Sequence, residues 1–382
     1  MVRILTLVIL NISFLIFNYS ISLGQELITI NNPEKGAWQD LKTKPITYSL
    51  VQVFGEDIDD ANAEGVLFSS HRSIWGLDTD DEGNVYALDI DVPMLVKISP
   101  KGELLWQRDQ RGRGPGDLEN AYSMAVSDLV YVSNVRGTRI DVFDKLGNYI
   151  KSIDLSQFDL KYDYMIVGTI ENNYLVLKAP FYKNNEAKIL ILDIKNNFSI
   201  TSEFTFSEEP EVPIPDSPNI QNRTTIVDNF IVVSSYLSYK LSYFDIKGRL
   251  VKEVRREFPK FKRPGVYNAG NGNSHVSASS YIVGFHKINE KYLINQIVWT
   301  DNIEDDMDRI ARDIYNGNYP TFVHKNSVDL YSYQGELLYS EDGDGVYPAI
   351  GKIMHTDHEG FLYTVASEPF PQVRKYKVVM NE

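Results

Sequence analysis

Two stretches near opposite ends of the chain share one ten-residue pattern. Residues 77–86 read LDTDDEGNVY and residues 354–363 read MHTDHEGFLY. Threonine, aspartate, glutamate, glycine and tyrosine recur in the same order at a constant offset of 277 residues (356 − 79 = 277; 363 − 86 = 277). Each copy has alternating apolar residues on both sides of an acidic turn that contains glycine, which is typical of a β-hairpin. An internal repeat of this kind indicates a fold assembled from similar units.

A second unit recurs between these two copies. Residues 142–150 (VFDKLGNYI) correspond to residues 243–251 (YFDIKGRLV). Looser copies of the same hairpin occur at 96–104, 190–198 and 328–337. The turns of successive copies are about 45–50 residues apart, except for a last step of 87 residues (335 − 248 = 87), which must contain insertions. One hairpin followed by another at this spacing predicts the four-stranded blade of a β-propeller.

The repeat predicts six blades. Their innermost strands are expected to begin near Ser73, Ala121, Tyr164, Arg223, Ser279 and Ile350. The sixth blade supplies only three strands of its own, and strand 46–54 is left over at the start. We expect 46–54 to pair antiparallel with 372–379, because this closure leaves no open sheet edge. The predicted fold is an all-β, six-bladed β-propeller of four-stranded antiparallel blades, with its last blade closed by the N-terminal strand.

The second blade carries a family resemblance. Residues 111–118 read RGRGPGDL, and they are followed by MAV at 124–126, VYVSN at 130–134 and TRIDVFD at 138–144. This succession resembles a blade of the NHL-repeat propellers. The resemblance implies a six-bladed ring and, in most members, a binding function, whereas a minority are lyases or lactone hydrolases. Because one fold hosts many functions, the function must be argued from the site.

The N-terminal residues are typical of a secretory signal. Arg3 precedes a largely apolar stretch, 4–17, that is too short to cross a bilayer, and small residues occupy the cleavage positions. We therefore predict a signal peptide at 1–24, an N-terminal segment at 25–44 and the propeller at 45–382. The expected location is periplasmic or secreted, with no transmembrane segment in the mature chain.

Composition narrows the possible functions. The 382 residues include no cysteine, which excludes a lipid-anchored cysteine, a thiol nucleophile and disulfide bonds. The formal net charge of −14 repels nucleic acid and anionic membranes unless basic residues cluster. The 24 tyrosines and 18 phenylalanines favour half-buried strands and can supply the large core that an exported protein without disulfides needs.

The long connections are all expected on one face of the ring. In a propeller, the connections between blades and those between second and third strands emerge on the same face. The long ones here are 107–120, 154–163, 206–222, 256–278 and 301–326. Loops on a rigid scaffold commonly carry function. Apolar residues at helical spacing over 303–315 predict a short helix inserted in blade 5, either a packing brace or a lid over the central funnel.

Basic side chains in these loops are the candidate ligand-binding residues. They are Arg72, Arg111, Arg113, Arg136, Arg263, His71 and His275. Arginine binds carboxylates and phosphates through a planar fork, so the expected partner is a small anionic ligand or a protein segment, and not nucleic acid. The alternative is that the arginines pair with loop acids such as Asp109, Asp117 and Glu119 and join the blades.

No pattern in the sequence indicates catalysis. The six histidines form no HExxH motif, and no G-x-S-x-G signature occurs. Asp78, Asp80, Glu82 and Asp89 approximate a calcium-loop spacing, but no helices flank them, and a turn with its acids in water is favoured. We predict no catalytic residue, metal or cofactor, and a non-catalytic binding protein. Two alternatives stay open: a metal-dependent lyase or lactone hydrolase with its site in the funnel, and a structural module of an envelope assembly.

Overall fold

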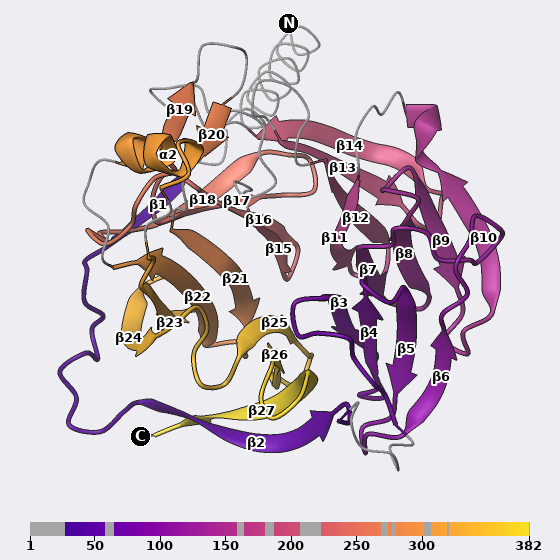
Figure 1. Cartoon of the computed structure of the whole chain (residues 1–382), viewed down its shortest axis with the longest axis horizontal. Coiled ribbons are helices and arrows are strands. Elements are labelled where there is room, and N and C mark those ends of the chain that lie inside the picture. The colour runs from indigo at the N-terminus through magenta and orange to yellow at the C-terminus, as the bar shows by residue number, and fades with distance from the viewer. Residues whose placement is uncertain are drawn as a thin grey trace, which may run out of the picture.

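The strands form a ring of six sheets around a central axis (Figure 1). The computed structural model describes residues 27–57, 65–158, 164–179, 187–206, 223–268, 274–276, 280–301, 307–318 and 321–381. The predicted signal peptide lies outside these residues. Each blade is a four-stranded antiparallel sheet whose first strand is innermost, as the repeat predicts.

The first three blades follow the order of the chain. Blade 1 comprises β3 (Ile74–Thr79), β4 (Val85–Asp89), β5 (Met94–Ile98) and β6 (Leu104–Arg108). Blade 2 comprises β7 (Ser123–Val126), β8 (Val130–Asn134), β9 (Arg139–Phe143) and β10 (Tyr149–Asp154), followed by the short 3-10 helix η1 (Leu155–Phe158). Blade 3 comprises β11 (Met165–Ile170), β12 (Tyr174–Ala179), β13 (Ala187–Asp193) and β14 (Ser199–Phe206).

The other three blades contain the additions. Blade 4 comprises β15 (Thr224–Val227), β16 (Phe230–Ser234), β17 (Lys240–Phe244) and β18 (Leu250–Arg256). Blade 5 comprises β21 (Tyr281–Lys287), β22 (Tyr292–Thr300), β23 (His324–Ser332) and β24 (Leu337–Asp344). Blade 6 comprises β25 (Lys352–Thr356), β26 (Leu362–Ala366) and β27 (Gln372–Met380), and β2 (Ile46–Phe54) is its outer strand.

The ring is closed by the N-terminal strand β2, as predicted. It pairs antiparallel with β27 in a register that runs from Ile46 opposite Met380 to Phe54 opposite Val373. A bulge between Leu50 and Gln52 interrupts the ladder. The two ends of the propeller are therefore joined by main-chain hydrogen bonds in one sheet.

The chain before β2 forms a strap that the sequence did not predict. Strand β1 (Ile28–Asn32) pairs parallel with β18 on the outer edge of blade 4. The chain then crosses blade 5, where the N–H groups of Ala37 and Trp38 donate to carbonyls of β24 at 3.1 and 2.7 Å. In Figure 1 the strap is the indigo segment that runs from β1 around the outside of the ring to β2. Its hydrogen bonds tie the N-terminal segment to blades 4, 5 and 6.

The ten-residue repeat has a physical basis in one buried hydrogen-bond arrangement. In blade 1, Asp80 accepts a hydrogen bond from the Tyr86 hydroxyl at 3.0 Å and forms an ion pair with Lys97 at 3.2 Å. The equivalent residues in blade 6 are Asp357, Tyr363 and Lys375. The expectation of acids exposed to water was wrong here, because Asp80 is only 4% exposed and is held by protein donors.

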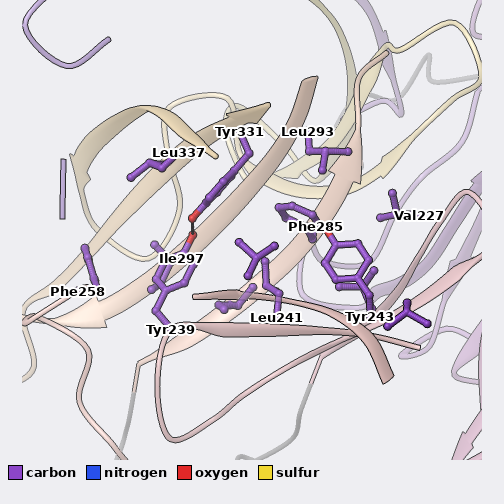
Figure 2. Packing of buried hydrophobic residues seen from close by; sticks show 14 of the residues in the cluster. Val227, Tyr239, Leu241, Tyr243, Phe258, Phe285, Leu293, Ile297, Tyr331 and Leu337 are labelled. Atoms are coloured by element: carbon purple, nitrogen blue, oxygen red, sulfur yellow. Dashed lines mark hydrogen bonds between the residues drawn. The ribbon is translucent and has the colours of Figure 1, made fainter. Parts of the chain in front are cut away.

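The apolar core lies between neighbouring blades. Figure 2 shows the cluster between blades 4 and 5, in which Tyr243 meets Phe285 edge to face and the hydroxyls of Tyr331 and Tyr239 are hydrogen-bonded at 2.8 Å. The Tyr239 hydroxyl also reaches Asp329, which is fully buried. Aromatic side chains fill the wedge-shaped space between sheets, and their polar tips need partners when buried.

The helix in blade 5 is present but does not cover the centre of the ring. Helix α2 (Met307–Tyr315) buries Met307 and Ile310 as predicted, while Ile303 lies outside the described residues. It packs on an unpredicted two-stranded hairpin, β19 (Val266–Asn268) and β20 (Ser274–Val276), from the connection between blades 4 and 5. Figure 1 shows both elements at the periphery. This position supports the packing brace and not the lid.

Candidate functional site

Two of the predicted arginines, Arg113 and Arg136, lie near one acid, Glu119. Arg113 donates to Glu119 at 2.6 Å within a single loop, and its side chain is 78% exposed. Arg136 and Arg139 are close enough to Glu119 that, together with the Arg113 hydrogen bond, they lower the pKa of its carboxyl. Arg111 donates weakly to the Asp91 carbonyl at 3.4 Å. Arg113 therefore pairs with a loop acid, as the alternative expects, but this pair lies within one loop and does not join two blades.

The other predicted residues are distributed over the ring. Arg263 binds both carboxylate oxygens of Asp308 on α2, at 3.2 and 2.9 Å, and so holds the insertion together. His275 lies in β20, and its side chain is outside what the structure describes. His71 and Arg72 precede the innermost strand of blade 1 and are the two predicted residues that lie next to the group described below.

Three further basic residues lie at the end of the blades where the innermost strands begin. Arg223 immediately precedes β15 of blade 4, and Lys352 is the first residue of β25 of blade 6. Lys178 is on β12 of blade 3, directly opposite the first residue of β11, Met165. These positions are on the face where the long connections emerge. We call Lys178, Arg223 and Lys352 the inner cation cluster.

Arg223 interacts electrostatically with both lysines. Burial and the charge of Arg223 lower the pKa of Lys352 to about 8. Burial and the same Arg223 lower the pKa of Lys178 to about 7. His71 extends the group toward blade 1, because burial and the charges of Arg72 and Lys352 lower its pKa. Arg223 thus connects two lysines from different blades.

No described carboxylate forms an ion pair with Arg223 or Lys352. Such an arrangement costs stability, since each unit by which a lysine pKa falls corresponds to about 1.4 kcal/mol of lost interaction with the charged form. Two cations such as Arg223 and Lys352, placed close to each other in a protein with a net charge of −14, are a feature that anion-binding sites share.

Aromatic side chains border the cluster. Tyr281, the first residue of β21, interacts electrostatically with Arg223 and is hydrogen-bonded to Tyr347, and burial raises its pKa. On blade 1, Trp75 is 49% exposed although it is on an innermost strand, and its indole N–H donates to the carbonyl of Arg72 at 2.8 Å. These rings could contact the apolar face of a ligand whose charged groups bind the cations.

A second titratable group lies at the opposite end of the innermost strands. His355 Nε2 is 2.9 Å from Thr79 Oγ1 and 3.5 Å from Asp78 Oδ1. Both oxygens approach the same ring nitrogen, so the group lacks the acid–base–nucleophile relay, which uses both nitrogens. Burial and His355 lower the pKa of His286 to about 3, which keeps that imidazole neutral.

The described residues offer no metal site. No group of three or more histidine, aspartate or glutamate side chains among them converges closely enough to hold a metal ion. The carboxylates with calcium-loop spacing bind protein donors instead: Asp89 accepts from the Ser69 N–H at 2.8 Å, and Asp78 from the Val126 N–H at 2.7 Å.

Sequence reasoning missed the inner cation cluster. Lys178 stands in the apolar strand YLVLKA, and Lys352 stands between Gly351 and Ile353 at the start of another strand. The sequence signal for this cluster is a lysine at the same end of the first or second strand in more than one blade. Lys178 and Lys352 lie in strands and not in the long loops, and Arg223 marks the expected start of a blade.

By its fold the protein is a six-bladed β-propeller, and it has basic residues on the face where the long connections emerge. No protein-family model and no curated protein sequence matches the chain. Among solved structures, it is similar to a Bacteroides fragilis protein described as exported, with a TM-score of 0.56 and 10% identity over 93% of this chain and 100% of that chain.

A DUF4221-family member from Bacteroides vulgatus is similar with a TM-score of 0.54 and 11% identity, over 88% of this chain and 99% of that chain. Virginiamycin B lyase from Staphylococcus aureus has a TM-score of only 0.44, at 10% identity over 87% of this chain and all of that chain. The six sheets of the ring confirm the fold expected from the NHL resemblance, and the two likenesses with TM-scores above 0.5 agree with it. Across the described residues, no helix has the length and apolar character that a membrane span requires.

Proposed function

We propose that this protein is an exported, non-catalytic binding propeller that takes an anionic ligand at its loop-rich face. The observation that carries the proposal is the inner cation cluster, Lys178, Arg223 and Lys352, contributed by three blades of an acidic protein. Arg72 and His71 border it. An anion placed among these groups relieves their mutual repulsion, so binding gains energy that the empty cluster lacks.

The export part of the proposal rests on two supports. The N-terminal 24 residues have the order of basic start, short apolar stretch and small cleavage residues that signal peptides share. The similar Bacteroides fragilis protein is described as exported. Cell fractionation with N-terminal sequencing of the mature protein tests this part, and a mature chain that begins at Met1 in the cytoplasm would contradict it.

The loop arginines are proposed to have a secondary role. Arg111, Arg113 and Arg136 are exposed on the same face, and Glu119 already compensates part of the charge of Arg113 and Arg136. We propose that they attract an anion toward the face, an effect that salt screens over about 10 Å at 0.1 M ionic strength. The strong contacts are assigned to the inner cation cluster.

Calorimetric titration with acidic and neutral oligosaccharides and peptides tests the binding proposal. The double variant Arg223→Ala/Lys352→Met should lose binding of the acidic compounds, whereas Arg113→Ala/Arg136→Ala should weaken it by a smaller factor. Arg249→Ala is the matched control, because Arg249 is on the opposite face in the turn between β17 and β18 and pairs with Asp245. Hits that are all neutral, or that bind wild type and the first double variant equally, would refute the anion site.

A further inference from the structure

Trp75 differs from the other three tryptophans of the chain. It is 49% exposed, and among the described residues it meets no aromatic ring. It is the second residue of β3, an innermost strand of the ring (Figure 1). Ligand sites commonly combine such an aromatic ring with a few polar groups. The other three pack edge to face on aromatic side chains: Trp38 on Tyr292, Trp106 on Tyr86 and Trp299 on Phe258.

The main chain around Trp75 is fixed by a β-bulge. Ile74 pairs with Asp89 and Gly76 with Leu88 on β4, so Trp75 between them has no partner on the neighbouring strand. Bulges of this kind redirect a side chain and are frequent at functional sites. A Cβ atom at Gly76 would lie 2.4 Å from Cγ of Met124, so β3 packs tightly against blade 2 immediately after the bulge. The exposed ring is therefore carried by a backbone that is itself buried.

Hydrogen bonds also fix the orientation of the indole ring. Its N–H donates to the carbonyl of Arg72 at 2.8 Å. The turn that carries Arg72 is fastened to blade 1, because the fully buried Asp89 accepts from the Ser69 N–H at 2.8 Å, and the hydroxyls of Ser69 and Ser73 are 2.8 Å apart. Since the indole N–H is already used, Trp75 offers a ligand the face of its ring and no donor.

A free cation lies beside this ring. The side chain of Arg72 is exposed and forms no ion pair with a described carboxylate, while its carbonyl is held by the indole. Burial and the charges of Arg72 and Lys352 lower the pKa of His71, so that the preceding imidazole is neutral at pH 7. Arg72 therefore supplies the positive charge next to Trp75. A guanidinium binds a carboxylate through its planar fork.

We propose that Trp75 and Arg72 form a subsite for an acidic sugar, with one face of a hexuronic acid ring on the indole and its carboxylate on the guanidinium. This inference rests on the proposed anion-binding function and names its ligand class. Three residues separate the two positions only in numbering, because the hydrogen bond from the indole to the Arg72 carbonyl brings them together. The subsite is held in place before any ligand arrives, which reduces the entropy lost on binding.

The open side of Trp75 favours a sugar over an aromatic acid. A pyranose ring presents C–H groups on one face and hydroxyl groups around its edge. A single indole can cover the C–H face while the hydroxyls stay in water. A flat aromatic acid has two apolar faces, and without a second ring among the described residues one of them would stay in water.

Titrations followed by nuclear magnetic resonance test the proposal with four probes: methyl β-glucuronide, methyl β-glucoside, acetate and benzoate. We expect the glucuronide to bind about tenfold more tightly than the glucoside or acetate, because it alone uses both the ring and the guanidinium. Trp75→Ala should weaken the glucuronide about tenfold and leave acetate unchanged. Arg72→Met should reduce the glucuronide to the affinity of the glucoside. Leu105→Ala is the matched control, because Leu105 is also 49% exposed but lies on β6, the outer strand of the same blade.

Trp75→Phe covers the possibility that alanine disturbs β3. It keeps an aromatic face, so it should retain most of the glucuronide affinity while losing the change in tryptophan fluorescence that the ligand causes. Equal binding of glucuronide and acetate, both lost in Arg223→Ala/Lys352→Met, would overturn the sugar subsite and leave the anion site standing. Tighter binding of benzoate than of the glucuronide would also overturn the sugar. Absence of binding for every acidic probe would overturn both proposals.

Discussion

Lys352 is a partly buried cation that interacts electrostatically with two other bases, Arg223 and His71. Burial and Arg223 lower its pKa to about 8, against an ordinary value of 10.5. The unfolded chain therefore binds more protons than the folded protein between pH 8 and 10.5, and this residue makes stability rise with pH across that window. Below pH 8 both states are protonated, and the full penalty acts on the folded state.

Replacing Lys352 by methionine should therefore stabilise the protein at neutral pH. We expect a gain of about 1–2 kcal/mol in the free energy of unfolding at pH 7, reduced from the full linkage value by partial exposure, and a smaller gain at pH 10. Urea denaturation at both pH values measures it. Lys101→Met, in an exposed turn, should change little at either pH, and a Lys352→Met protein less stable than wild type at pH 7 would show that the charge is compensated.

The sequence revealed single residues well where their role is local and poorly where it depends on the ring. Asp80 and Asp357 belong to a visible repeat because each hydrogen-bonds within its own hairpin. Lys178, Arg223 and Lys352 share no motif, and only their place at the same end of the first or second strand of a blade connects them in the sequence. The loop arginines were predicted to bind a ligand because of their residue type and loop positions. In the structure, Arg263 and Arg113 already have carboxylate partners.

At the scale of elements, the hairpin repeat located all six innermost strands to within two residues of their observed starts, because each blade buries the same alternating pattern. Strand β1 and the hairpin β19–β20 were missed. Each has only three to five residues and pairs in a way the blade repeat does not specify: β1 parallel to β18, and β19 with β20 inside a long connection. Helix α2 was found from its apolar spacing, but its position on β19–β20 depends on that missed hairpin.

The insertion should respond to mutation as a unit that is separate from the ring. Ile310 is 6% exposed and packs with Met307, Ile314 and Phe322. Ile310→Asp buries an unpaired charge and should destabilise the insertion by roughly 2–4 kcal/mol. Hydrogen–deuterium exchange should accelerate in α2 and β19 but not in β21–β24, whereas Asn316→Asp, at an exposed site after the helix, should change neither. Faster exchange throughout blade 5 would contradict an independent brace.

At the scale of the whole molecule, the N-terminal strap supplies both ring closure and an outer belt. Strand β2 completes blade 6 through hydrogen bonds with β27, whereas β1 only adds a fifth strand to blade 4, which already has four. A sheet that loses an outer strand exposes main-chain groups and the side chains that this strand covered. The two parts of the strap should therefore differ in their effect on stability.

Removing 27–54 should open blade 6 and lower the melting temperature strongly, with aggregation through the exposed edge of β27. Removing 27–32 alone should cost less, because β18 keeps its partner β17 and loses only the parallel pairing with β1. Thermal denaturation followed by circular dichroism and light scattering compares both with the full chain. An unchanged melting temperature after removal of 27–54 would refute closure by β2. An equal loss in both variants would mean that the pairing of β1 with blade 4 contributes as much stability as the closure of blade 6.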